Sequence, residues 1–209
     1  MNLLIASVLG GIFVSDATAF GQFMFSRPIF CGPVIGLITG DVRTGLYVGM
    51  IMELLWISVV PLGSEVPPDS SVVSTSAAYI GAGSGGDRGF VVFLILALVP
   101  LGILFKRVDM LHREFNVYFA HKTEEKLTEG DVSYVGRAAV YGFLLFFLKG
   151  TLFLAAVMGA GAIIFPAAYE LFPGWIKGAL GEVFYVLPAI GLGTAVTAFM
   201  FKRSKSSRR

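Results

Sequence analysis

The sequence predicts an all-α integral membrane protein that is polytopic, with broken or re-entrant helices in its N-terminal half. Of its 209 residues, 56% are hydrophobic and only 14% are charged, whereas soluble domains carry roughly 25% charged residues. Its mean hydropathy is +0.79, which points to several membrane spans. In the N-terminal half, polar patches divide the apolar runs into pieces too short to cross a bilayer.

The predicted N-terminal membrane region covers residues 1–105. Its apolar pieces lie at residues 3–14, 29–40 and 46–62, and a longer apolar run follows at residues 90–105. A helix needs about 20 apolar residues to span the bilayer. Irregular backbone at membrane depth persists where it is buried in protein or lines a wet cavity, so we expect a solute site here. The N-terminus has no basic leader or small-residue cleavage site, so we expect it in the mature protein.

The remainder of the chain alternates between charged and apolar regions. Residues 106–137 carry six cations and six acids, which predicts a cytoplasmic polar helical connection. Two apolar runs within residues 138–201 predict a transmembrane helix pair. Residues 202–209 carry five cations and no acid, which predicts a basic cytoplasmic tail and is too few cations for a nucleic-acid partner. The side of Met1 stays open.

Glu53 is the most unusual single residue, because residues 46–61 place apolar neighbours on every helical face around it. A carboxylate at mid-helix costs about 2.5–3.5 kcal/mol unless it is paired or solvated. Trp56 follows three residues later and shares its face. A carboxylate beside an aromatic plane is a common way to hold a polyol. The alternative is a structural ion pair with Arg27 or Arg43.

Asp69 follows two prolines and precedes a run of small residues, so we expect it to cap a helix. Capping and solute contact are both compatible with this position, since a helix N-terminus facing a cavity also presents N–H donors. Gln22, Ser26 and Arg27 form a polar cluster before Pro28, where Arg27 is expected to be extended. The alternative for Arg27 is an interfacial loop cation.

Several other features predict structure rather than chemistry. The small-xxx-small spacing of close helix packing occurs at Gly32, Gly36 and Gly40, and again at Gly45 and Gly49. Cys31 is the single cysteine, which predicts a buried thiol without a disulfide. We expect His112 and His121 to be solvated. Lys149 either snorkels or lines a path. The sequence has no P-loop, dinucleotide or HExxH motif, so we expect no cofactor, no metal and no catalytic residue.

The order and spacing of these elements from residue 21 to residue 74 resemble a known signature. It is that of the IIC component of the mannose/fructose/sorbose family of bacterial phosphotransferase systems. The matching elements are Arg27-Pro28, Gly40-Asp41, the Gly45/Gly49 spacing, Glu53-Leu54, Gly63 and Pro68-Asp69. The rest of the chain resembles the family in hydropathy and in its charged central region.

The resemblance implies a transport subunit of the bacterial cytoplasmic (inner) membrane, not an enzyme. In that family, IIC forms the sugar pathway together with a second membrane protein, IID, in an oligomeric assembly. A soluble IIB protein, charged through IIA and HPr, phosphorylates the sugar, typically a hexose. Carried over by motif, Glu53 and Asp69 would hold sugar hydroxyls, with Gln22, Ser26 and Arg27 nearby.

Other readings stay open beside this one. Members of that family extend beyond the point where this chain ends, so either IID completes the pathway or the chain is a shortened member with altered activity. A shortened chain that only docks or regulates soluble phosphotransferase proteins through residues 106–137 is one alternative. A secondary transporter in which Glu53 carries a proton or a sodium ion is another.

Overall fold

The computed structural model describes residues 2–19, 21–57, 59, 67–129 and 131–206, with the side chains of residues 198, 199 and 201–206 left out of the description. These residues form helices α1 (Asn2–Thr18), α2 (Pro28–Thr39), α3 (Val42–Trp56), α4 (Ser70–Ala82), α5 (Arg88–Thr128), α6 (Ser133–Glu170) and α7 (Gly174–Ser206). They contain no strand, so the predicted all-α class is confirmed.

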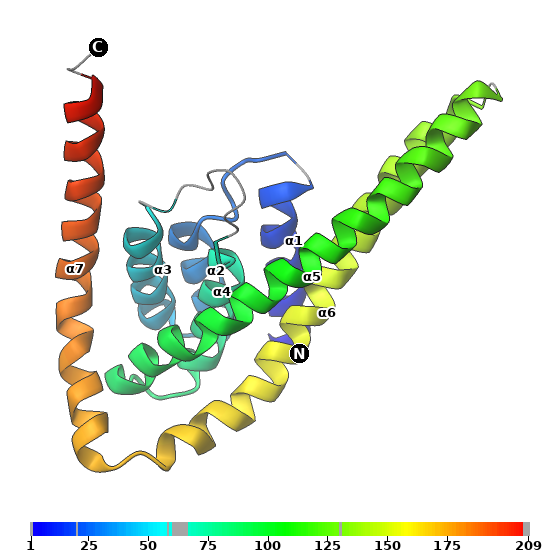
Figure 1. Cartoon of the computed structure of the whole chain (residues 1–209). Coiled ribbons are helices and arrows are strands. Elements are labelled where there is room, and N and C mark those ends of the chain that lie inside the picture. Colours follow the sequence, from blue (N-terminus) through cyan, green and yellow to red (C-terminus); the bar gives the residue numbers. More distant parts are fainter. Residues whose placement is uncertain (1, 20, 58, 60–66, 130, 207–209) are drawn as a thin grey trace.

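Helices α1 to α4 form a compact cluster of short helices (Figure 1). They have 17, 12, 15 and 13 residues, each below the length of about 20 residues that spans a bilayer. The prediction of short, interrupted helices in the N-terminal half is therefore confirmed. Within the described residues, α5, α6 and α7 are the helices long and apolar enough to cross a membrane.

The glycine spacing explains how closely α2 and α3 pack. A Cβ atom added to Gly32 would lie 2.6 Å from the Gly45 carbonyl oxygen, and one added to Gly45 would lie 2.5 Å from the Gly32 carbonyl oxygen. The two backbones therefore touch, as the small-xxx-small pattern predicts. Gly40 has another role, because it ends α2 with a φ of 87°. Asp41 then begins α3 by accepting a hydrogen bond from the Thr44 N–H at 3.1 Å.

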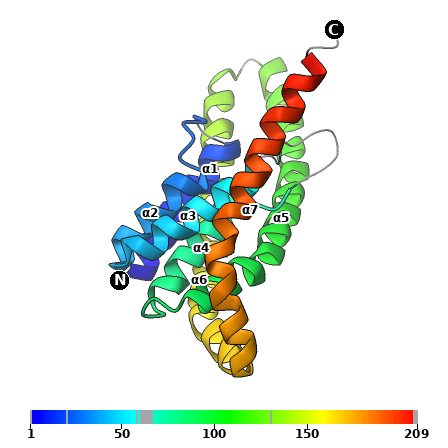
Figure 2. The same ribbon diagram turned by 90° about the vertical axis from the view of Figure 1, so that its left-hand side faces the viewer.

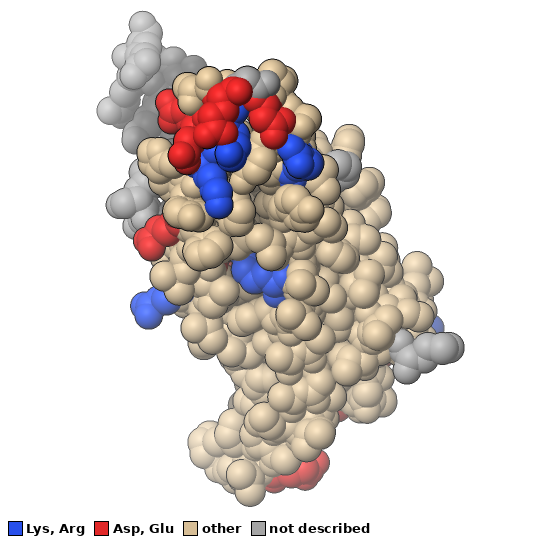
Figure 3. Space-filling view, turned by 90° about the vertical axis from the view of Figure 1, so that its right-hand side faces the viewer, with Lys and Arg blue, Asp and Glu red and all other residues tan. Residues whose placement is uncertain are grey.

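Helices α5 and α6 form a long antiparallel hairpin that projects beyond the cluster, and we call its projecting part the arm (Figure 1). The polar stretch 106–137 is therefore not a separate element, since it forms the outer part of α5 and the beginning of α6. Figure 3 shows charged side chains gathered at the tip of the arm, above a body with few charges. Helix α7 packs along α3 and α5 on the other side of the molecule (Figure 2). The tail 202–209 lies outside the described side chains.

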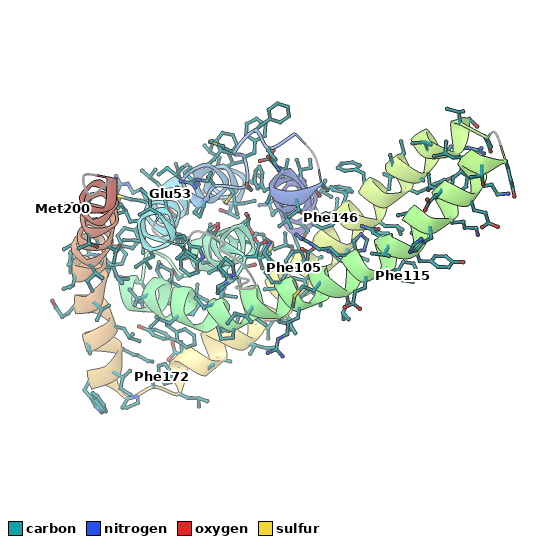
Figure 4. The ribbon with its side chains drawn as sticks, turned by 45° about the horizontal axis from the view of Figure 1, so that its top comes forward. Glu53, Phe105, Phe115, Phe146, Phe172 and Met200 are labelled. Atoms are coloured by element: carbon teal, nitrogen blue, oxygen red, sulfur yellow. The ribbon has the colours of Figure 1, made fainter. Side chains whose placement is uncertain are left out.

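A buried ion pair joins α5 to α6 where the arm leaves the cluster. The carboxylate of Asp109 is 2% exposed and lies 2.8 Å from Lys149 Nζ and 3.3 Å from Arg113 Nε. The Lys149 ammonium also lies 3.9 Å from the centre of the Phe146 ring, and Figure 4 shows Phe105 and Phe146 in this region. Lys149 therefore does not snorkel, because its side chain is 15% exposed and held by Asp109.

The two histidines differ from each other. His121 is exposed, as predicted. The prediction is wrong for His112, whose Nε2 atom is buried without a hydrogen-bond partner among the described residues. Its ring packs edge-on against Phe146, with centroids 5.6 Å apart. The prediction failed because the charged residues around His112 indicate a solvated surface, whereas this part of α5 packs against α6.

Candidate functional site

A cavity of about 190 Å³ lies where the ends of α1 and α3 meet the beginnings of α2 and α4, beside the middle of α5. Five of the six residues expected to form a solute site line it, namely Ser26, Arg27, Glu53, Trp56 and Asp69. The sixth, Gln22, is exposed on the connection before α2 and is not among the lining residues. We call this cavity the Glu53 cavity.

Glu53 lies near the end of α3, where Figure 4 labels it. Its Oε1 atom forms an ion pair with the guanidinium of Arg27, and its Oε2 atom accepts a hydrogen bond from the Ile29 N–H at 3.4 Å. The ion pair with Arg27 that the sequence left open is therefore present. The Glu53 side chain is 15% exposed and that of Arg27 is 51% exposed, so Glu53 is the more buried partner of the pair.

Asp69 has two roles, one for each carboxylate oxygen. Its Oδ1 atom accepts hydrogen bonds from the N–H groups of Ser71 and Val72, at 3.0 and 3.1 Å, which caps α4 as predicted. Its Oδ2 atom lies 2.8 Å from Lys106 Nζ, and its side chain is only 4% exposed. A buried carboxylate is tolerated where it is paired and hydrogen-bonded, and Lys106 completes that pairing.

Lys106 is a site residue that the sequence analysis missed. It stands at the boundary between an apolar run and the polar stretch, so it was assigned to the cytoplasmic connection. In the structure it lies inside α5, is 18% exposed and reaches the Glu53 cavity. Its place at the end of an apolar run was the one sign in the sequence that Lys106 could reach a site inside the protein. Its pairing with Asp69 could not be predicted, because that pairing depends on how α4 packs against α5.

Asp16 is a second missed residue, and it shapes the connection between α1 and α2. Its buried carboxylate accepts hydrogen bonds from the N–H groups of Phe23 at 2.8 Å and Ser26 at 3.2 Å. The Ser71 hydroxyl donates to the Ser26 carbonyl oxygen at 2.6 Å. The backbone of Ser26 is thus tied to α1 and to α4. Arg27 follows with φ −69° and ψ 134°, extended as predicted.

Trp56 closes the cavity from the end of α3. Its Nε1–H donates to the Pro68 carbonyl oxygen at 3.2 Å, which joins α3 to the chain entering α4. The cavity therefore combines two carboxylates, two cations and an indole ring. Such a set offers acceptors and donors for hydroxyl groups and a flat apolar surface, which is the chemistry that a polyol requires. The described residues contain no group of three or more His, Cys, Asp or Glu side chains that could hold a metal ion.

The profile of the family described as the PTS system sorbose-specific IIC component matches residues 1–205. The chain belongs to this family. It is similar to the putative N-acetylgalactosamine permease IIC component 2 of Escherichia coli K12, with 35% identity over 111 residues, 50% of this chain and 83% of the relative. It is 26% identical over 189 residues to the N-acetylgalactosamine permease IIC component 1 of the same organism, covering 86% of this chain and 66% of the relative.

A solved structure shares the fold of this IIC chain. The cryo-EM structure of the mannose transporter ManYZ in complex with microcin E492 superposes with a TM-score of 0.63 at 17% identity, covering 95% of this chain and 77% of that chain. The match with the mannose-specific EIIC component of Escherichia coli K12 spans 41% of that relative's length. The predicted family is confirmed by the profile match over residues 1–205. As a IIC component, the chain is a transport subunit and a multi-pass protein of the bacterial inner membrane.

Proposed function

We propose that this IIC subunit binds a hexose-type sugar in the Glu53 cavity and forms part of its path across the membrane in a phosphoenolpyruvate-dependent phosphotransferase system. The observation that carries the proposal is the meeting of Glu53, Asp69 and Trp56, from three separate elements, in one small cavity. Relatives named for N-acetylgalactosamine, mannose, fructose and sorbose support the class of sugar.

The ion pairs define how a sugar would bind. Arg27 is half-exposed and holds one oxygen of Glu53, so a sugar hydroxyl can replace the guanidinium there while Arg27 donates to another sugar oxygen. We expect Lys106 to stay paired with Asp69, at the 2.8 Å seen in the structure, when the sugar binds. Asp69 then continues to cap α4. A hydrogen bond to a charged group contributes about 1.5–3 kcal/mol. The sugar and the Arg27 guanidinium therefore compete for the carboxylate of Glu53.

We further propose that a IID membrane subunit covers part of the arm. Three large apolar side chains at the helical spacing i, i+4 and i+7 on α5 are more than half exposed, namely Leu111, Phe115 and Tyr118. Contiguous exposed apolar surface on a membrane protein is covered by lipid or by another protein. Phosphoryl transfer would belong to a soluble IIB protein charged through IIA and HPr. Neither His112 nor His121 is among the residues that line the Glu53 cavity, which supports this division.

The proposed orientation places the arm tip and the C-terminus in the cytoplasm. The tip and the C-terminal end of α7 lie toward the same end of the molecule, at the top of Figure 1. Both carry basic residues at the end of a membrane-length helix, and such residues favour the cytoplasmic side. The Glu53 cavity lies at this end of the short-helix cluster, where a sugar would be released toward IIB.

The substitution Glu53→Gln tests the proposal. It keeps the size of the side chain and removes the charge, so sugar affinity is expected to fall about tenfold to 150-fold, the ratio for one charge-assisted hydrogen bond. The measurement is uptake of radiolabelled sugar by cells with the complete phosphotransferase system, with the amount of IIC in the membrane determined in parallel. Glu182→Gln, at an exposed position on α7, is the matched control and is expected to leave uptake unchanged.

Three results would contradict the proposal. Normal uptake by Glu53→Gln would remove the site assignment. Proton- or sodium-driven uptake in vesicles that lack phosphoenolpyruvate would favour a secondary transporter. Failure of the purified chain and its membrane partner to bind any sugar would favour a regulatory role.

A further inference from the structure

A second polar cavity lies at the opposite end of the short-helix cluster. It measures about 430 Å³ and is lined from the end of α4, the beginning of α5 and the end of α6, with contributions from the beginning of α1 and the end of α2. Small-molecule sites measure roughly 300–1,000 Å³, so this cavity has the size for a small ligand. We call it the Tyr169 cavity. These elements meet at the lower end of the molecule in Figure 1.

The lining of the Tyr169 cavity shares two features with the Glu53 cavity, a pair of carboxylates and aromatic side chains. The Tyr169 hydroxyl donates to Asp87 Oδ1 at 3.4 Å, and the same oxygen caps α5 by accepting from the Phe90 N–H at 3.1 Å. The carboxylate of Glu170 lies at the rim and pairs with Lys177 Nζ at 3.1 Å. Two carboxylates and a phenol thus line the space.

Aromatic rings form the apolar part of the same lining. Tyr169 is 5% exposed and packs against Phe90 with ring centroids 5.2 Å apart. Tyr79, from the end of α4, also lines the cavity. Acceptors beside aromatic surfaces suit a ligand with hydroxyl groups on one side and C–H groups on another. A pyranose or another polyol has this distribution.

Helix α4 connects the two cavities. Its first turn, with Ser70 and Ser71, lines the Glu53 cavity, and its last turn lines the Tyr169 cavity. Between them, Ser74, Thr75 and Ser76 are fully buried. The Ser76 hydroxyl has no hydrogen-bond partner among the described residues. An unsatisfied buried hydroxyl costs about 1–3 kcal/mol, and here it occurs on the helix that joins two polar cavities.

We propose that the Tyr169 cavity is a second subsite for a monosaccharide, at the membrane face opposite the Glu53 cavity, where the sugar binds before it reaches Glu53. This inference rests on the proposed function, because it assigns the same class of ligand to the other end of α4. Asp87 and the Tyr169 hydroxyl bind sugar hydroxyls, and the rings of Tyr79 and Phe90 cover its apolar face. Lys177 holds Glu170 at the rim.

Cysteine protection tests the subsite separately from transport. Ser84 lines the Tyr169 cavity, and the chain's own Cys31 is fully buried, so Ser84→Cys provides one reactive thiol there. The chain is co-purified with its membrane partner in nanodiscs and labelled with maleimide, with and without N-acetylgalactosamine, mannose, fructose or sorbose. At least one sugar is expected to slow labelling. Gly174→Cys, at an open position on α7, is the control whose labelling no sugar changes.

Two added substitutions separate this subsite from the Glu53 cavity. Protection of Ser84→Cys is expected to persist when Glu53→Gln is introduced, since the two cavities lie at opposite ends of α4. Tyr169→Phe is expected to raise the half-protecting sugar concentration about two- to tenfold, the ratio for one neutral hydrogen bond. Tyr141→Phe, at an exposed position on the same helix, is expected to leave that concentration unchanged.

Each result supports or overturns the assignment. A thiol at position 84 that does not react, or that reacts equally with and without every sugar, overturns it, as does protection that disappears with Glu53→Gln. If any of these results is found while the wild-type chain still supports phosphoenolpyruvate-dependent uptake, the subsite is wrong and the proposed function still stands. If uptake fails while protection persists, the subsite stands and the proposed function falls.

Discussion

Removing Lys149 tests whether the buried ion pair stabilises the contact between α5 and α6 where the arm leaves the short-helix cluster. The carboxylate of Asp109 is 2% exposed and is held by Lys149 Nζ at 2.8 Å and by Arg113 Nε at 3.3 Å. Breaking a buried pair by removing one partner costs about 3–5 kcal/mol, because the other charge stays buried. Arg113 remains in Lys149→Met, so we expect a loss near the lower limit, about 3 kcal/mol.

A double substitution of Asp109 and Lys149 tests whether the loss of stability in Lys149→Met comes from the unpaired carboxylate of Asp109. Replacing a whole buried pair by apolar residues of similar volume is often neutral or stabilising. We therefore expect Asp109→Leu combined with Lys149→Met to recover to within about 1 kcal/mol of the wild type. Arg113, whose side chain is 63% exposed, loses little when its carboxylate is removed, since exposed pairs contribute about 0–1 kcal/mol.

The free energy of unfolding is measured by denaturant titration of the purified protein in detergent, followed by circular dichroism. Lys122→Met, at an exposed position on the arm, is the matched control and is expected to change that energy by less than about 0.5 kcal/mol. Wild-type stability in Lys149→Met, or a double variant as unstable as the single one, would refute the reasoning.

The remaining predictions concern packing, capping and orientation. Gly45→Ala should destabilise the protein by about 1–3 kcal/mol, because the new Cβ meets the Gly32 carbonyl oxygen at 2.5 Å. Gly178→Ala has open space and should be neutral or slightly stabilising, so equal stabilities would contradict the packing argument. Asp69→Ala should be less stable than Asp69→Asn by about 1 kcal/mol, since asparagine retains the cap of α4; identical thermal midpoints would argue against the cap. Ser206→Cys should react with an impermeant maleimide in inside-out vesicles and not in intact cells. Labelling in intact cells would contradict the proposed orientation.

Local features of the site were predictable because their causes lie within a few residues. Asp69 caps α4 because two prolines precede it and small residues follow. Arg27 is extended because Pro28 restricts it. The glycines of α2 and α3 predict close packing because their spacing places them on one face of each helix. Cys31 is buried, as an apolar run around a thiol predicts.

Partners across helices were not predictable in the same way. Lys106 pairs with Asp69, and Lys149 pairs with Asp109, across contacts between different helices. Arg27 and Arg43 were equal candidates for Glu53 until the packing of α2 against α3 placed Arg27 beside it. Gln22 belongs to the same sequence cluster as Ser26, yet the turn between them leaves it outside the cavity lining.

The sequence by itself determined the helical membrane class, the family, the short helices of the N-terminal half and the cap that begins α4. These follow from apolar run lengths, prolines, glycines and capping residues, which act over one or two helical turns. Only the tertiary structure decided which cation faces which carboxylate, why Asp16 holds the backbone at Ser26, and that a second polar cavity lies at the far end of α4. Those facts depend on how helices distant in the chain approach one another, and hydrophobic packing sets that approach without leaving a local pattern in the sequence.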